Sequence, residues 1–243
     1  MSAILPSVYG PDALDRIRHE VARRPHSRLD ARRFFPARDG VLTLVYAGFP
    51  SPLVEIKNLL EEMLPGLGPE DEGSKWPKTT LAAVRDGTTL DPDRVARLLQ
   101  LCAEANEQLE KTPVRVPVLS IDVVRYMCRS LERDKTPVRL EFDAIMSDNS
   151  VPSTHLEAVE GVLEQADEPH VRSYAPQVGG SGHRCSHYRE RSTGWSLVVS
   201  SPVGELEPVR LFRSRVENAL PDVFSWFASN SLHVTVRSLN PTG

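Results

Sequence analysis

Short runs of β-branched and apolar residues alternate along this chain with longer segments in which apolar residues recur every three or four positions. The runs predict strands, and the periodic segments predict amphipathic helices. Strands are predicted at about 41–47, 76–84, 115–126, 138–146, 195–200 and 231–239, and helices at about 54–63, 91–111, 154–165 and 206–220. This mixture predicts an α+β protein.

The order of these elements repeats along the chain. A strand, a helix that ends in Leu-Pro, a loop and a second strand occur in 41–84 and again in 195–239. An internal duplication leaves such a pattern. We therefore expect 41–243 to form one domain of two lobes, lobe one at about 41–126 and lobe two at about 138–239. The two lobes should face each other, with the paired strands lining the central cleft between them.

Two segments fall outside this repeat. Residues 1–40 are rich in arginine and are expected to form an N-terminal extension. This extension can be a solvated helical face, a phosphate-contacting arm or an organelle-targeting segment, although transit peptides avoid acids such as Asp12 and Glu20. The segment at about 148–191 is expected to be an irregular insertion or lid, because periodicity is lost after its first part.

Each half of the repeat carries two polar side chains two residues apart on a predicted strand. These pairs are Lys78 with Thr80, and His233 with Thr235. Side chains two apart on a strand share a face, so each pair can address one ligand. Arg237 should continue on the face of His233, where it can contact a phosphate or form a salt bridge at the rim.

The motifs Lys78-Thr79-Thr80 and His233-Val234-Thr235 resemble those of the 2H phosphoesterase superfamily, the LigT-like and cyclic-phosphodiesterase-like proteins. In that family each lobe carries His-x-Thr or His-x-Ser on a central strand. The resemblance covers about 41–239, apart from the insertion. It implies a duplicated LigT-like fold, in which antiparallel sheets face the central cleft and helices lie on the outer faces. It also implies acid/base catalysis, without metal or cofactor, on a cyclic phosphate or phosphodiester of a nucleotide or RNA end.

The chain departs from this family at Lys78. An ammonium group is protonated at neutral pH, so it can donate a proton or stabilise negative charge but is a poor base. The resemblance then implies that His233 is the general base, that Lys78 is the acid or an electrostatic clamp, and that Thr80 and Thr235 bind phosphate oxygens. Two alternatives stay open. The altered lobe can bind a phosphorylated ligand without turnover, or both residues can be structural, with Lys78 as an edge-strand charge.

Other residues with useful chemistry have two interpretations each. Trp76 and Tyr46 can stack a nucleobase or pack in the core. His183 and His187 are four residues apart and can bind a metal from one helix face, but the glycines beside them favour a loop. No metal site is therefore predicted, and the chain has no Walker loop, Gly-x-Gly-x-x-Gly or Gly-x-Ser-x-Gly motif.

Composition narrows the setting. The net charge of −4 argues against coating nucleic acid through overall charge, so a polyanion site must be local. Three scattered cysteines do not make a disulfide framework, and no apolar run reaches the length of a membrane span. We expect a monomer in the cytoplasm or nucleus without a membrane partner, while organelle targeting through the arginine-rich segment stays open.

Overall fold

The computed structural model describes residues 5–70, 75–133, 135–143 and 149–242. Some expected segments lie partly outside the described residues. They are the expected extension at 1–4, lobe one at 71–74, lobe two with the start of the insertion at 144–148, and residue 243.

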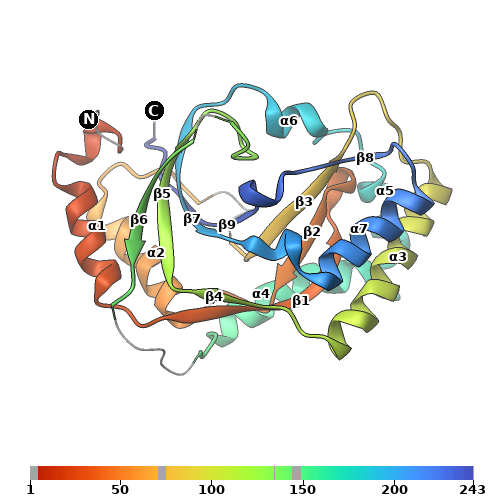
Figure 1. Ribbon diagram of the computed structural model, residues 1–243, viewed down its shortest axis with the longest axis horizontal. Helices are drawn as coiled ribbons and strands as arrows, with labels where there is room; N and C mark the ends of the chain where they lie inside the picture. The colour runs from red at the N-terminus through yellow and green to blue at the C-terminus, as the bar shows by residue number, and fades with distance from the viewer. Residues whose placement is uncertain (1–4, 71–74, 134, 144–148, 243) are drawn as a thin grey trace.

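One antiparallel sheet of nine strands runs through the described residues, in the order β4-β1-β2-β3-β9-β7-β5-β6, with β8 paired to β3. Figure 1 shows that the sheet curls strongly. The strands are β1 (Ser27–Pro36), β2 (Leu42–Tyr46), β3 (Lys78–Val84), β4 (Arg115–Val118), β5 (Ser120–Tyr126), β6 (Thr136–Glu141), β7 (Gly194–Ser200), β8 (Phe224–Trp226) and β9 (His233–Ser238).

Helices flank this sheet. In Figure 1, α3, α5 and α7 gather at one end of the molecule, α1 and α2 lie at the other, and α6 stands apart at the upper edge. The helices are α1 (Ala13–Ala22), α2 (Ser51–Met63), α3 (Pro92–Lys111), α4 (Ser153–Leu163), α5 (Val171–Val178), α6 (Cys185–Arg189) and α7 (Glu207–Ala219). Short 3₁₀ turns occur at η1 (Ser7–Tyr9), η2 (Arg38–Gly40), η4 (Glu164–Ala166), η5 (Pro202–Glu205) and η6 (Ser229–Ser231). No helix in the described ranges combines the length and apolar character needed to cross a bilayer.

The α+β prediction is confirmed, but the expectation of two separate sheets is wrong. Thr79 of β3 pairs with Val234 of β9, so the two strands that carry the polar pairs are neighbours in one sheet. Both residues are fully buried. The two halves therefore join through backbone hydrogen bonds at the middle of the sheet instead of facing each other across a gap.

The N-terminal segment is part of this sheet, and a domain boundary at residue 40 is wrong. β1 pairs with β2 on one side and β4 on the other. Its apolar residues Leu29 and Phe34 are buried, whereas the Arg32 and Arg33 guanidinium groups lie 3.1 Å from Glu160 and 2.8 Å from Asp167. These two arginines thus form the outer, ion-paired side of β1. The number of basic residues in this segment gave no indication that it is a strand.

The insertion is also more regular than expected. A helix near 154–165 is confirmed by α4, but α5 and α6 follow in the part predicted to be irregular. Tyr174 and Val178 of α5 are buried, and the Tyr174 hydroxyl donates to the Pro36 carbonyl at 3.2 Å. A helix of eight residues shows only two turns of periodicity, too few to stand out in the sequence.

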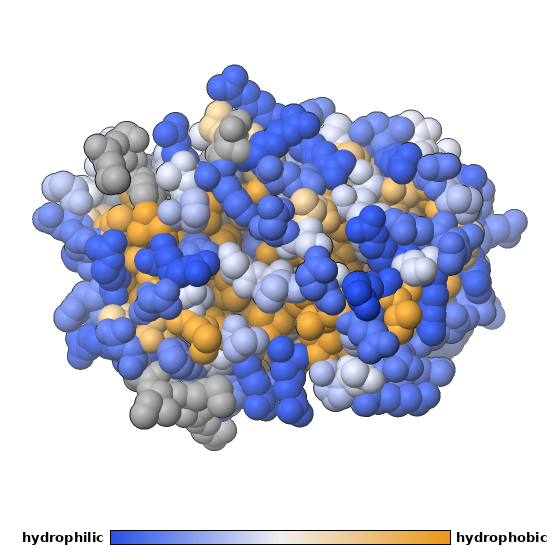
Figure 2. Space-filling model, viewed as in Figure 1, coloured by the Kyte–Doolittle hydropathy of each residue, from blue (hydrophilic) through white to orange (hydrophobic). Residues whose placement is uncertain are grey.

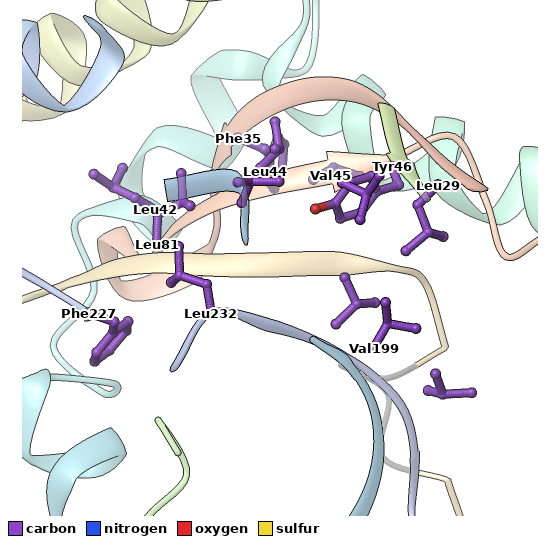
Figure 3. Close-up of a cluster of buried hydrophobic side chains, with 14 of the residues drawn as sticks. Leu29, Phe35, Leu42, Leu44, Val45, Tyr46, Leu81, Val199, Phe227 and Leu232 are labelled. Carbon is purple, nitrogen blue, oxygen red and sulfur yellow. The ribbon is translucent and has the colours of Figure 1, made fainter. Parts of the chain in front are cut away.

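The central strands are fixed by an apolar core. All five residues of β2 are buried, and Figure 3 shows Leu42, Leu44 and Leu81 of β2 and β3 within this core. Burial of one such side chain contributes about 1.5 to 3 kcal/mol. The face of β3 and β9 away from the core is therefore presented at a fixed position.

Candidate functional site

The register of β3 and β9 brings the two polar pairs together. Because Thr79 pairs with Val234, the antiparallel ladder sets Lys78 opposite Thr235 and Thr80 opposite His233. Opposed side chains share a face, with Cβ atoms about 4.5 to 5.5 Å apart. The four side chains thus form a compact group with local twofold symmetry, in which each cation or imidazole lies beside the threonine of the other strand.

These four residues line one cavity of about 270 Å³. Small-molecule sites commonly measure about 300 to 1,000 Å³, so the cavity suits a ligand of modest size. Figure 2 shows hydrophobic side chains at the centre of the face seen in Figure 1, with hydrophilic side chains along its margins. The cavity thus brings together the four residues His233, Thr235, Lys78 and Thr80 that the sequence analysis singled out.

His233 is held in one tautomer. Its Nδ1 lies 2.8 Å from the carbonyl oxygen of Ser231, which can only accept, so Nδ1 carries the proton. Burial lowers the pKa of His233; the bond to Ser231 raises it, and the nearby charge of Lys135 lowers it further. The neutral imidazole therefore keeps Nε2 unprotonated at neutral pH, as a general base requires.

Lys78, in contrast to the neutral His233, is mostly charged at neutral pH. Burial lowers its pKa to about 8, and its Nζ lies 3.9 Å from the centre of the Trp76 ring. With a pKa about one unit above pH 7, roughly nine tenths of the Lys78 side chains are protonated. The cavity thus holds an ammonium group that can donate a proton and an imidazole that can accept one.

Arg237 does not reach this cavity, contrary to the sequence prediction. Thr235 pairs with Val198 and Arg237 with Leu197, so β9 has an extra residue at Val236. Such a bulge reverses the alternation of side chains. Arg237 is buried on the other side of the sheet, where its Nη2 donates to the Gly68 carbonyl at 2.7 Å and lies 3.5 Å from Glu61. Ser238, one residue further on, faces the cavity instead.

The two proposed stacking residues do not line the cavity either. Tyr46 is fully buried in the core, as Figure 3 shows, and its hydroxyl lies 2.8 Å from the Thr79 hydroxyl and 3.3 Å from that of Ser201. Trp76 packs against the core and contacts the Lys78 ammonium group. Both therefore support β3 and its neighbours, and neither offers a ring to a ligand in the cavity.

Other residues on the cavity wall were not foreseen. Tyr126, Arg129, Tyr188 and Phe227 line it, and the Tyr188 and Phe227 rings lie 5.3 Å apart. Arg129 lies between the strands predicted at 115–126 and 138–146, and Tyr188 lies in the expected insertion. Tyr126 is the last residue of β5, whereas loops and one short helix, which no periodic pattern marks, carry the other three to the site.

His183 and His187 lie near this wall without forming a metal site. Their rings stack at 4.3 Å, and the described ranges contain no group of three or more His, Cys, Asp or Glu side chains arranged to hold a metal. They come from α6 and the residues just before it, so the expectation of a glycine-rich loop holds only up to Arg184.

Comparisons of the chain with family models, curated proteins and solved structures found no match. The chemistry of the cavity is therefore argued from its own residues.

Proposed function

We propose that this protein is a phosphoesterase of the 2H type, with a duplicated LigT-like fold, that acts on a cyclic phosphate or phosphodiester of a nucleotide or RNA end. The observation that carries the proposal is the pairing of Lys78 and Thr80 with Thr235 and His233 on neighbouring strands that face one cavity. The order strand, helix, strand in β2-α2-β3 recurs in β7-α7-β9, where the short strand β8 is added between α7 and β9, and this recurrence supports the duplication.

In the proposed reaction, Nε2 of His233 removes a proton from the attacking water as its oxygen forms a bond to phosphorus. The Lys78 ammonium group donates a proton to the departing ester oxygen as its bond to phosphorus breaks. Each such proton transfer typically contributes 10²- to 10⁴-fold to the rate. The products are a phosphate monoester and a hydroxyl, which stay in one molecule when the substrate is cyclic, and solvent then restores both protonation states.

Thr80 and Thr235 complete this arrangement as hydrogen-bond donors to the non-bridging phosphate oxygens. The Thr80 hydroxyl lies opposite His233, and the Thr235 hydroxyl lies opposite Lys78, in each case on the neighbouring strand. A phosphate centred among the four side chains therefore has the base and the acid on opposite sides, which an in-line displacement requires.

The rest of the cavity favours a nucleotide over a simple phosphate ester. Tyr126, Tyr188 and Phe227 offer aromatic surface, on which bases stack with about 1 to 3 kcal/mol each, and Arg129 adds a second positive charge. A site of about 270 Å³ accommodates a nucleotide or the last nucleotide of an RNA and leaves no room for a duplex.

The second candidate function is binding of the same ligand without turnover. It is favoured by the contact of the Lys78 ammonium group with Trp76, because a cation held on an aromatic ring is stabilised in its charged form. In that case Lys78 provides affinity for phosphate but no proton transfer.

The test is incubation with 2′,3′-cyclic nucleotides, RNAs ending in a cyclic phosphate and 2′,5′-linked oligonucleotides, with product analysis. We expect turnover that His233→Ala abolishes while nucleotide binding is retained. Exposed His170 provides a matched control, since His170→Ala should leave turnover unchanged. Turnover that survives in His233→Ala contradicts the assigned mechanism, and binding without turnover by the wild type identifies the protein as a binding module. Lys78→His separates the roles of the lysine, because raised activity indicates a degenerate acid position.

A further inference from the structure

Three segments that are distant in sequence meet beside His233. They are the loop after β5, which contains Ser130, the helix α6, which contains Tyr188, and the turn η6, which ends at Ser231. Each of these three residues lines the cavity. The loop and α6 are joined by a hydrogen bond from the Ser130 N–H to the Tyr188 carbonyl at 3.0 Å.

Arg189, the last residue of α6, ties this helix to the loop after β5 and to β8, the strand that precedes η6. Its Nε and Nη2 donate to the two carboxylate oxygens of Glu132 at 2.7 and 3.0 Å. Its Nη2 and Nη1 also donate to the Trp226 carbonyl at 2.9 Å and to the Ser225 hydroxyl at 2.6 Å. A bidentate guanidinium–carboxylate pair fixes orientation as well as distance.

Glu132 is the junction of this network. Besides Arg189, its carboxylate accepts from the Ala228 N–H and from the Ser130 hydroxyl, both at 3.0 Å, and its side chain is only 15% exposed. Burial alone raises the pKa of this carboxyl, but the hydrogen bonds from Arg189, Ala228 and Ser130 outweigh it and lower the pKa. The group is therefore an ionised acceptor with two donors on each oxygen.

The turn held by Glu132 carries the carbonyl that orients His233. The Ala228 carbonyl accepts from both the N–H and the hydroxyl of Ser231 at 2.8 Å. The Ser231 carbonyl then accepts from Nδ1 of His233. A second bond, from Lys135 Nζ to the Asn230 carbonyl at 3.0 Å, fastens the same turn to the loop after β5.

We propose that Glu132 and Arg189 are positioning residues for His233, which hold the turn Ala228–Ser231 so that its carbonyl selects the Nδ1–H tautomer. The role rests on the proposed function for its catalytic consequence, but the tautomer itself is independent of any substrate. Groups that fix the second nitrogen of a working histidine commonly change activity 10- to 100-fold when they are removed. Here the Ser231 carbonyl orients His233 directly, and the Glu132–Arg189 ion pair acts indirectly, by holding the turn that carries this carbonyl.

The variants Glu132→Ala and Glu132→Gln test this role. Glutamine keeps one oxygen for the Ala228 N–H, whereas alanine removes the acceptor. The ¹⁵N chemical shifts of the His233 ring, assigned by comparison with His233→Ala, report the tautomer without any substrate. We expect the Nδ1–H form in the wild type and in Glu132→Gln, and a mixture of both tautomers in Glu132→Ala. The other histidine signals away from this network should keep their positions in every variant.

Kinetics on a 2′,3′-cyclic nucleotide provide the second measurement. We expect kcat of Glu132→Ala to fall about 10- to 100-fold, and KM to change far less, because the phosphate ligands are untouched. Glu217→Ala is the control, since it removes an exposed ion pair with Arg213 at 2.9 Å on α7 and should leave the tautomer and kcat unchanged.

A single Nδ1–H tautomer in folded Glu132→Ala overturns the proposal, whatever the kinetics show. If Glu132→Ala does not fold by circular dichroism, Arg189→Ala replaces it, because alanine removes every bond that the guanidinium donates to Glu132, Ser225 and Trp226, and the same mixture of tautomers is expected. A wild type without turnover refutes the phosphoesterase assignment alone, and the tautomer comparison still decides the positioning role.

Discussion

Replacing Lys78 with methionine should make the protein more stable at pH 7. Burial lowers the pKa of Lys78 from 10.5 to about 8, which corresponds to a cost on the order of 3 kcal/mol for holding the ammonium group in the folded state. The contact with Trp76 offsets about 0.5 to 2 kcal/mol in the variant comparison, because methionine loses it. The net expected gain in the free energy of unfolding is therefore about 1 to 2.5 kcal/mol.

The sign of the pH dependence follows from the same shift. Between pH 8 and pH 10.5 the unfolded chain keeps a proton on Lys78 that the folded chain has released, so wild-type stability rises with pH through this window. The advantage of Lys78→Met should shrink accordingly as the pH rises from 7 to 10.

Urea unfolding followed by tryptophan fluorescence at pH 7, 8, 9 and 10 measures both effects. Lys111→Met provides the control, because Lys111 is exposed at the end of α3 and its replacement should change stability by no more than about 0.5 kcal/mol. A Lys78→Met protein that is less stable than the wild type at pH 7, or whose difference from it does not depend on pH, refutes the reasoning.

Three further predictions follow from the site. The pH profile of kcat/KM should rise with the titration of His233 below pH 6.5 and fall near pH 8 with Lys78; fixed-pH assays from 5 to 10 locate both limbs, and a profile without a fall up to pH 10 contradicts a general acid with a pKa near 8. Arg237→Met should lower the free energy of unfolding by about 1 to 3 kcal/mol through loss of the bond to the Gly68 carbonyl, yet leave KM unchanged; a raised KM would place Arg237 in the site after all. Tyr188→Ala should weaken nucleotide binding by about 1 to 3 kcal/mol in calorimetry while inorganic phosphate binding is unchanged; equal loss for both ligands argues against stacking.

Much of the central sheet could be predicted from the sequence because its strands are strongly apolar and bounded by proline or glycine. β2 is such a strand, and the alternation in β3 and in the first half of β9 was enough to place Lys78 on one face with Thr80 and His233 on one face with Thr235. The prediction failed at Arg237, since a single bulged residue inverts the alternation and leaves no mark in the pattern.

The remaining failures have a common physical origin in long-range contacts. β1 becomes a strand because two neighbours pair with it, and its arginines are accommodated by acids more than 120 residues away, such as Glu160. Tyr188 reaches the cavity because Arg189 binds Glu132, 57 residues earlier. Neither long-range contact has a local sequence signal. The residues of β3 and β9 could therefore be predicted, whereas Tyr188 could not.

In the proposed phosphoesterase, Lys78 takes the place of a second histidine and changes the protonation states available to the site. Burial lowers the pKa of both His233 and Lys78, but the ordinary pKa values of the two groups differ by about four units. Because the pKa of His233 is lowered and that of Lys78 is about 8, there is a range of pH between them in which the histidine is neutral and the lysine is charged. Two histidines of similar pKa reach that combination only in a fraction of molecules at any pH, because each titrates where the other does. In the proposed reaction, Lys78 thus fixes which group accepts and which donates: His233 accepts a proton from the attacking water, and Lys78 donates one to the departing oxygen. On this account Lys78→His should sharpen the pH optimum and lower it toward 6.5, and an unchanged broad plateau would show that the lysine has no part in proton transfer.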